Sequence, residues 1–129
     1  MRIALLLSVL LPLLLGGCNQ SPFGLKHEIH GNTVTITGCD EDASGELVIP
    51  DTIKGKTVTA IGQDSFKRCV GLTSITIPDG VTRIGESAFE SCNRLTSVTI
   101  GDSVASIGHS AFRGCARLRS ITIPDSVTS

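Results

Sequence analysis

The sequence contains three consecutive blocks of 23 residues that align without a gap, at 58–80, 81–103 and 104–126. The first two blocks share twelve identical positions, and the last two share fourteen. Ten positions are identical in all three, and in the middle block these are Val81, Ile84, Gly85, Phe89, Cys92, Leu95, Ser97, Thr99, Ile100 and Asp102. A fixed period of this length indicates a solenoid, because one short coil cannot bury its apolar face alone and stacked coils share one continuous core.

The last third of each block predicts a half-buried strand. In residues 72–77, apolar side chains alternate with small polar ones, which is the period of a strand with one buried face. Ile75 and Ile77 are therefore expected to point inward, and Ser74 and Thr76 to point outward. The chain has no Trp or Tyr and only four Phe, so the shared core must be mainly aliphatic.

The remainder of each block predicts a corner, a second strand and a turn. Residues 78–80 (Pro-Asp-Gly) form the corner, since proline presets φ and glycine accepts positive φ. Residues 81–85 predict a second short strand, and residues 87–92 predict one helical turn with Phe89 and Cys92 on the same face. We therefore expect a mainly β solenoid with two short parallel strands and a helical turn per 23-residue repeat.

The N-terminus has the anatomy of an export signal. A positive start at Arg2 precedes an apolar run that is too short to span a bilayer comfortably, followed by Leu15-Gly-Gly-Cys18. These four residues resemble the bacterial lipobox, which implies a signal peptide at 1–17, lipidation of Cys18 and a membrane anchor. Residues 18–30 are expected to be a lipidated tether. Asn19 is not the aspartate typical of inner-membrane retention, so we expect the protein at the outer membrane or cell surface.

The repeat itself resembles a known family. Residues 111–124 read Ala-Phe-Arg-Gly-Cys-Ala-Arg-Leu-Arg-Ser-Ile-Thr-Ile-Pro, which is similar to the BspA-type (Treponema-type) leucine-rich repeat of bacterial surface lipoproteins. The resemblance implies a right-handed solenoid. It also implies a module for protein–protein interaction or adhesion, because the family includes adhesins that bind host matrix proteins.

The resemblance also orders the rest of the chain. Residues 31–57 are interpreted as an N-terminal capping strand at 33–37 and a degenerate repeat at 45–51, followed by an insertion around residues 54–56. Residues 58–129 then hold three repeats and an incomplete fourth. A solenoid end without a polar cap exposes apolar side chains and strand edges, so end-to-end association of two copies is a further expectation. A fragment, or a structural module, of a longer repeat protein is the alternative interpretation.

The cysteines are expected to serve packing. Cys69, Cys92 and Cys115 recur at the repeat spacing and should stack as an inward ladder of small buried side chains that bond weakly to loop backbone. Neighbouring coils would bring these sulfurs within bridging distance, but three cysteines cannot all pair. No close pair of the Cys-x-x-Cys kind indicates a metal site. Cys39 lies outside the repeat, and the sequence leaves its pairing open.

No catalytic signature is present, so an enzyme is not expected, and no cofactor, metal or nucleic acid is implied. The candidate interaction residues are two columns of hydroxyls and a set of variable basic residues: Ser74, Thr76, Ser97, Thr99, Ser120, Thr122, Arg83, Arg94, Arg117 and Arg119. For any one arginine, the alternative is a merely solvating charge. The regular Ser-x-Thr columns also resemble the faces of solenoid ice-binding proteins, although small β-compatible residues suit any tightly spaced strand face.

Overall fold

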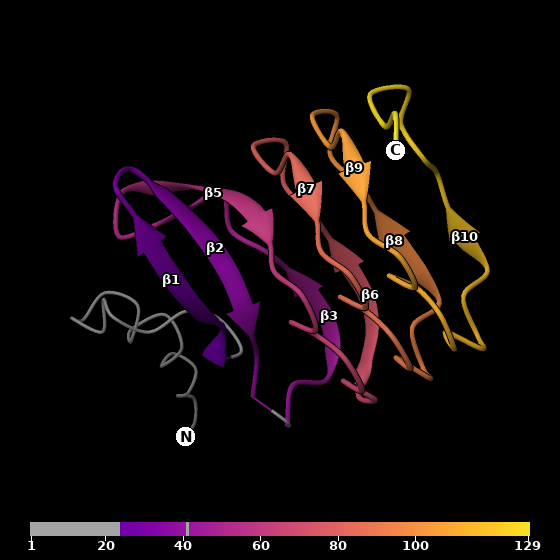
Figure 1. The fold of residues 1–129 in the computed structure, drawn as a ribbon. Helices are drawn as coiled ribbons and strands as arrows, with labels where there is room; N and C mark the ends of the chain where they lie inside the picture. Colours follow the sequence, from indigo (N-terminus) through magenta and orange to yellow (C-terminus); the bar gives the residue numbers. More distant parts are fainter. Residues whose placement is uncertain (1–23, 41) are drawn as a thin grey trace, which may run out of the picture.

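The computed structural model describes residues 24–40 and 42–129. Its strands form two sheets, one on each of two sides of the solenoid (Figure 1). The signal peptide and Cys18 lie outside these residues. The first sheet contains β1 (Lys26–His30), β2 (Thr33–Gly38), β4 (Thr52–Ile53), β5 (Lys56–Ile61), β7 (Arg83–Ile84) and β9 (Ser106–Ile107). The second sheet contains β3 (Gly45–Val48), β6 (Leu72–Thr76), β8 (Ser97–Thr99) and β10 (Ser120–Ile121).

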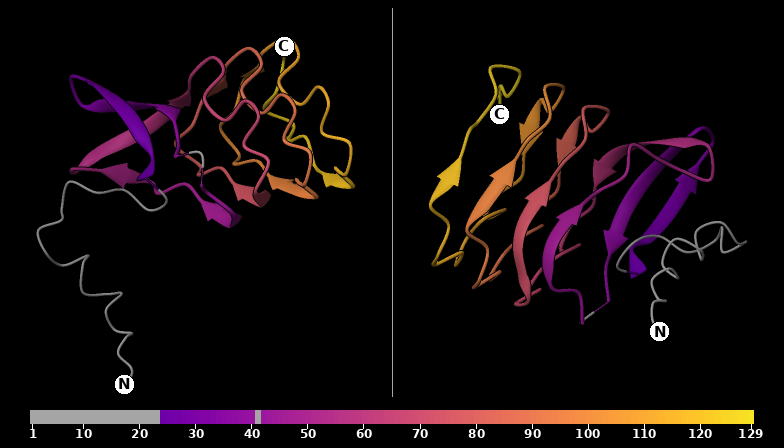
Figure 2. Two further views of the ribbon diagram at one scale, coloured as in Figure 1. Left: turned by 90° about the horizontal axis from the view of Figure 1, so that it is seen from below. Right: turned by 180° about the vertical axis from the view of Figure 1, so that it is seen from behind.

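The strands pair mostly in parallel, as successive coils of a solenoid do. The order in the second sheet is β10-β8-β6-β3, and the first sheet continues from β2 through β5, β7 and β9. Among the strands of residues 24–40 and 42–129, the β1–β2 and β4–β5 pairs are the antiparallel ones. Figures 1 and 2 show the β1–β2 hairpin at one end of the stack, with β9 and β10 at the other. The predicted β solenoid, with two short parallel strands in each repeat, is confirmed.

A single apolar core runs through the coils. Ile75 and Ile77 are both buried, as the alternation predicted, and Leu72 and Leu95 are fully buried at their repeat position. The phenylalanines form a ladder across the coils. Phe66 and Phe89 stack with ring centroids 5.1 Å apart, and Phe89 and Phe112 with centroids 5.3 Å apart. The largest core side chain of each repeat therefore packs on its own copy in the next coil.

The helical turn predicted for residues 87–92 is not present, and that prediction was wrong. Instead, the amides alternate between two kinds of partner. Those of Ala88, Glu90 and Cys92 close tight turns within the coil, on the carbonyls three residues earlier. Those of Ser87, Phe89 and Ser91 donate to the next coil. Ser87 and Ser91 adopt positive φ values of 54° and 63°, which are incompatible with a right-handed helix.

The first strand lies in a segment that was expected to be a tether. Lys26–His30 forms β1, pairs with β2 through a two-residue loop at residues 31–32, and so belongs to the folded part. Gly31 supplies the positive φ of 64° that this tight loop needs. The tether interpretation failed for these residues because β1 exposes most of its side chains and has only one apolar residue, Ile29. Its sequence therefore lacks the alternation of apolar and polar residues that predicts a strand. The Gly-Asn loop was the signal that could have revealed the hairpin.

Candidate functional site

The hydroxyl columns predicted from the sequence are aligned by the second sheet. The Cα register pairs Ser74 with Ser97 and Ser97 with Ser120, and it also pairs Thr76 with Thr99. Thr122 follows β10 in the same column. We call the outward surface formed by these six residues the hydroxyl face. Its side chains are partly or fully exposed, whereas the alternating positions Ile75 and Val98 are buried.

These six hydroxyls differ from the threonines that hold the coils together. Thr82 Oγ1 donates to the Thr59 carbonyl at 3.2 Å, and Thr96 Oγ1 donates to the Thr73 carbonyl at 3.0 Å, each to the preceding coil. Within residues 24–40 and 42–129, the hydroxyl face makes no such side-chain hydrogen bond. Its donors and acceptors are therefore available to an external partner.

Register extends both columns by one coil that sequence reasoning missed. Glu46 pairs with Ser74, and Val48 pairs with Thr76. Both are exposed, and Val48 retains 53% of its accessible surface. The regular Ser-x-Thr array therefore stops at a carboxylate and an apolar side chain. The degenerate repeat at residues 45–51 was the signal that placed these two residues on this sheet.

Basic residues border the hydroxyl face where the chain enters the second sheet. Arg94 and Arg117 occupy the same exposed turn position in successive coils, and exposed Arg119 immediately precedes β10. Arg83, in contrast, lies on β7 in the first sheet. The structure thus brings three of the four predicted arginines to one edge and separates the fourth from them.

Acidic residues border the opposite edge, where the chain leaves the second sheet. Asp79, Asp102 and Asp125 are exposed at the same corner position of three coils. The Asp102 amide donates to Asp79 Oδ1 at 3.2 Å, so the first of these corners also helps to position the second. Sequence reasoning had assigned these residues to turns alone, although their recurrence in every block was the available signal.

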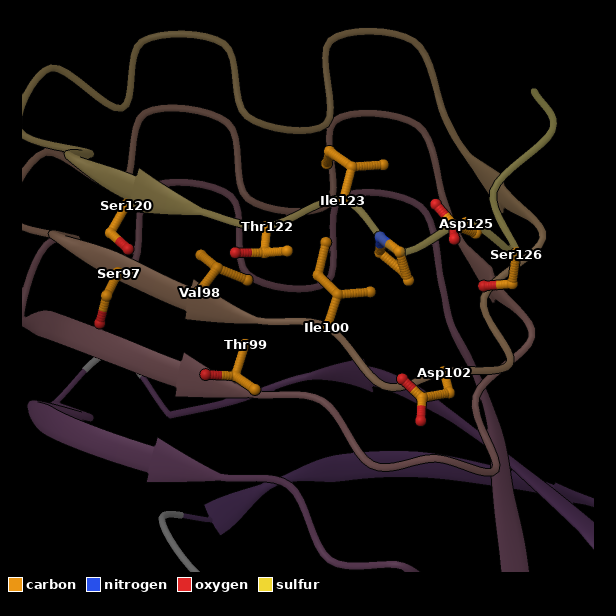
Figure 3. Close-up of a pocket in the computed structure, with 11 residues that line it drawn as sticks. Ser97, Val98, Thr99, Ile100, Asp102, Ser120, Thr122, Ile123, Asp125 and Ser126 are labelled. Carbon is orange, nitrogen blue, oxygen red and sulfur yellow. The ribbon is translucent and has the colours of Figure 1, made fainter.

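A shallow pocket lies along the last two coils of the second sheet (Figure 3). Ser97, Thr99, Ser120 and Thr122 line this shallow pocket together with Ile100 and Ile123, and Asp102 and Asp125 close one side. Ile123 keeps 50% of its surface exposed, whereas Ile100 is buried. Figure 3 shows Ser97, Thr99, Ser120 and Thr122 on one side of the strands and Ile100 and Ile123 on the other, so the hydroxyl face meets the exposed end of the core at this pocket.

The cysteine ladder faces the interior, away from the hydroxyl face. Cys92 Sγ donates to the Phe66 carbonyl at 3.1 Å, and Cys115 Sγ donates to the Phe89 carbonyl at 3.1 Å, which confirms the predicted bonding to loop backbone. Burial raises the pKa of Cys92 to about 12 and also raises the pKa of Cys115. These two thiols therefore stay protonated and serve packing.

Two further findings concern the part of the chain that the structure describes. No three of its His, Cys, Asp and Glu side chains are grouped closely enough to hold a metal ion. None of its segments forms a helix with the length and hydrophobicity needed to cross a membrane.

Comparison with protein families identifies the repeat. The BspA type leucine rich repeat region matches residues 46–129 with six copies. The chain belongs to the BspA-type leucine-rich repeat family. BspA-type leucine-rich repeat proteins are typically surface-exposed or secreted bacterial proteins, and leucine-rich repeat modules commonly mediate protein interactions and are typically non-enzymatic.

Solved structures with the same architecture are also bacterial. A Bacteroides capillosus leucine-rich repeat protein is 37% identical, with a TM-score of 0.71 and coverage of 78% of both chains. The Treponema pallidum leucine-rich repeat protein is 27% identical, with a TM-score of 0.77 over 83% of this chain and 50% of its own. A leucine-rich cell surface protein of Faecalibacterium prausnitzii is 33% identical, with a TM-score of 0.66 over 76% of this chain and 28% of its own.

This BspA-type chain therefore spans half, or less, of the Treponema and Faecalibacterium proteins. A comparison with curated proteins gave no match.

Proposed function

We propose that this protein is a bacterial surface lipoprotein, anchored through Cys18, that uses the hydroxyl face to bind another protein. The observation that carries the binding proposal is the composition of this face. Six hydroxyls that the fold does not use lie between an arginine edge and an aspartate edge. Such a surface offers hydrogen bonds in a fixed array and charges of both signs, which give specificity to protein recognition.

The family supports a binding role over a catalytic one. Leucine-rich repeat modules commonly serve protein interaction, and the Faecalibacterium relative is described as a cell surface protein. We propose that the present chain likewise has no catalytic activity and needs no cofactor, and that its partner is a protein of the host or of the cell surface. Adhesion is the form of this function that the family resemblance favours.

The anchor is proposed from the lipobox-like sequence that ends at Cys18. Two or more acyl chains give durable membrane attachment, whereas one chain binds only marginally. The lipid would hold the repeats close to the membrane, with the hydroxyl face open to solvent. The outer membrane or cell surface is the proposed location.

End-to-end association of two copies is also proposed. In the last coil, Phe112, Leu118 and Ile121 pack on the core but remain partly exposed. These side chains, with Ile123, are the surface through which two copies would meet. A closed two-fold dimer would cover both surfaces at once.

Metabolic labelling tests the anchor. Cells grown with labelled palmitate should incorporate the label into the wild-type protein, and Cys18→Ser should abolish both the labelling and the membrane association. The substitution leaves residues 24–129 unchanged, so a loss of attachment cannot be attributed to a change in the repeats. A Cys18→Ser protein that stays in the membrane fraction would contradict the lipoprotein proposal.

Substitution of the hydroxyl face tests the binding role. The double variant Ser97→Arg/Thr99→Arg fills the centre of the face and should weaken binding to a protein ligand at least tenfold, or about 1.4 kcal/mol. The probes are purified matrix proteins (collagen, laminin and fibronectin) immobilised for surface plasmon resonance. Because both positions are at the surface, the stability should change by less than about 0.5 kcal/mol each.

The matched control is Ser106→Arg on the first sheet. Arg83 occupies the equivalent position one coil earlier, so the fold already accommodates arginine there. This variant should bind like the wild type. Equal losses in both variants would mean that the second sheet is not the recognition surface, and failure of the wild type to bind any probe would count against matrix adhesion.

A further inference from the structure

The joint between the N-terminal hairpin and the first full repeat contains two thiols in contact. Cys39 follows β2 directly, and Cys69 follows the turns at residues 63–68 of the first coil. Their Sγ atoms are 3.1 Å apart, although the residues are separated by 30 positions in the sequence. A disulfide bond is about 2.05 Å long, so a small side-chain adjustment brings the two sulfurs to bonding distance.

This contact interrupts the pattern of the other cysteines. Cys92 and Cys115 each donate to the carbonyl of the phenylalanine in the preceding coil. The equivalent residue Cys69 has no preceding phenylalanine of this ladder, because Phe66 in its own coil is the first. Cys69 instead contacts the Cys39 sulfur. The geometry therefore singles out one pair among the four thiols of the described residues.

The backbone on both sides of the pair is held in place. Ser65 Oγ donates to the Ile36 carbonyl at 2.8 Å, and the Gly62 amide donates to the same carbonyl at 2.8 Å. The Cys69 amide donates to the Phe66 carbonyl at 3.0 Å. The two cysteines thus approach each other through a fixed junction between the hairpin and the first coil.

The pair is mostly buried but lies at the surface, whereas the next thiol in the ladder is fully buried. Cys39 and Cys69 retain 8% and 9% of their accessible surface, whereas Cys92 retains none. Both line a surface pocket together with Lys26, Lys67 and Arg68. Lys67 is paired with Glu90 at 2.9 Å, so Lys26 and Arg68 are the cations at this opening that favour the approach of an anionic disulfide reagent.

The two thiols also differ in acidity. The hydrogen bond from Cys39 lowers the pKa of Cys69, because the donated proton stabilises the Cys69 thiolate. The same contact raises the pKa of Cys39, and burial raises it further. Cys69 is therefore the attacking thiol in an exchange reaction, since the thiolate is the nucleophile.

We propose that Cys39 and Cys69 form a disulfide bond that joins the N-terminal hairpin to the first repeat. The Cys69 thiolate attacks a disulfide oxidant, such as glutathione disulfide, and displaces one glutathione thiolate. Cys39 then loses its proton and attacks the Cys69 sulfur of the mixed disulfide, which releases the second glutathione thiolate. The protein pair gives up two electrons and two protons, and the oxidant becomes two thiols.

The setting for this reaction rests on the proposed export, because disulfides form and persist in oxidising compartments. The chemistry itself is independent of the anchor. The bond would close a chain segment that contains β3, β4 and β5, and a closed segment has fewer unfolded conformations. Oxidation should therefore raise the melting temperature.

Peptide mapping tests the pairing in the full-length protein, purified in detergent. Trypsin cleaves after Lys and Arg, which places the four cysteines in separate peptides at 27–54, 69–83, 84–94 and 114–117, and Cys18 in another that ends at Lys26. Reduced protein is treated with glutathione disulfide, alkylated under denaturing conditions and digested without reductant. Mass spectrometry should find 27–54 linked to 69–83, with Cys92 and Cys115 alkylated.

Two variants and a thermal readout complete the test. Cys92→Ser should keep the cross-link, and Cys39→Ser should lose it. Oxidised wild-type protein should melt several degrees above the reduced form, and Cys39→Ser should show no such redox-dependent shift. Alkylation of all four cysteines in the oxidised wild type, or a cross-link between any other pair, would overturn the proposal even if Cys39→Ser failed to fold.

Discussion

Phe89→Ala should lower the free energy of unfolding by roughly 3–5 kcal/mol. Phe89 is fully buried and stacks on both Phe66 and Phe112, at 5.1 and 5.3 Å between ring centroids. Its removal leaves a cavity bordered by two aromatic rings that the neighbouring coils hold in place. A small domain has only about 5–15 kcal/mol of stability in total, so this variant should be close to unfolding at room temperature.

The measurement is urea denaturation followed by far-ultraviolet circular dichroism, because the chain has no Trp or Tyr for fluorescence. Thr99→Ala is the control, since Thr99 is exposed on β8 and makes no side-chain hydrogen bond within the described residues. It should change the stability by less than about 0.5 kcal/mol. Equal effects of the two substitutions would mean that the inner and outer faces of the coil are wrongly assigned.

Gly85→Ala should also be strongly destabilising, although it adds a single methyl group. A Cβ at residue 85 would lie 2.6 Å from the Gln63 nitrogen and 2.7 Å from the Gly62 carbonyl carbon, which are backbone atoms of the preceding coil. Backbone atoms cannot rotate away, so the two coils must separate locally. We expect a loss of about 1–3 kcal/mol from this overpacking, measured by the same denaturation experiment.

Gly38→Ala is the matched control for this prediction. A Cβ at residue 38 would lie 3.5 Å from the Ser65 carbonyl oxygen, which is an ordinary van der Waals contact. Replacing glycine by alanine where the backbone tolerates it stabilises a protein by about 0.4–1 kcal/mol, because the unfolded chain has fewer conformations. A Gly85→Ala protein as stable as Gly38→Ala would show that the preceding coil does not lie against the backbone at residue 85.

Most of the fold could be predicted from the 23-residue repeat period. Positions that recur every 23 residues face one environment in every coil, so the burial of Ile75 and the inward direction of Cys92 followed from alternation and spacing alone. The hydroxyl columns were predictable for the same reason, since Ser74, Ser97 and Ser120 occupy one repeat position. A repeat thus converts sequence spacing directly into spatial alignment.

The features that sequence reasoning missed depend on contacts between different parts of the chain. Residues 87–92 have the composition of a helical turn, but their alternate amides pair with the next coil, and these bonds impose positive φ at Ser87 and Ser91. Local propensity cannot reveal a preference that arises from a neighbouring coil. Similarly, the contact of Cys39 with Cys69 depends on how the hairpin meets the first repeat, where the 23-residue period no longer applies.

The edges of the candidate site were missed for a different reason. The aspartates at 79, 102 and 125 suit the corner that follows each strand, and a corner alone does not predict a binding edge. Because the strands of the second sheet are parallel, this acidic column lies at the edge opposite Arg94 and Arg117. Assigning a residue to a turn therefore does not exclude it from a surface that a partner would contact.

Three threonine side chains bond to the preceding coil at a constant sequence offset. The hydrogen bonds from Thr82 to Thr59, from Thr96 to Thr73 and from Thr128 to Ala105 each span 23 positions, which is the repeat period. Duplication of one 69-base-pair segment of the gene would consequently insert a coil whose neighbours already fit it, without compensating mutations. Loss of such a segment would shorten the stack equally cleanly. Unequal recombination can therefore adjust the reach and the number of binding columns of this protein in whole steps, while each coil keeps the nearest-neighbour contacts that stabilise it.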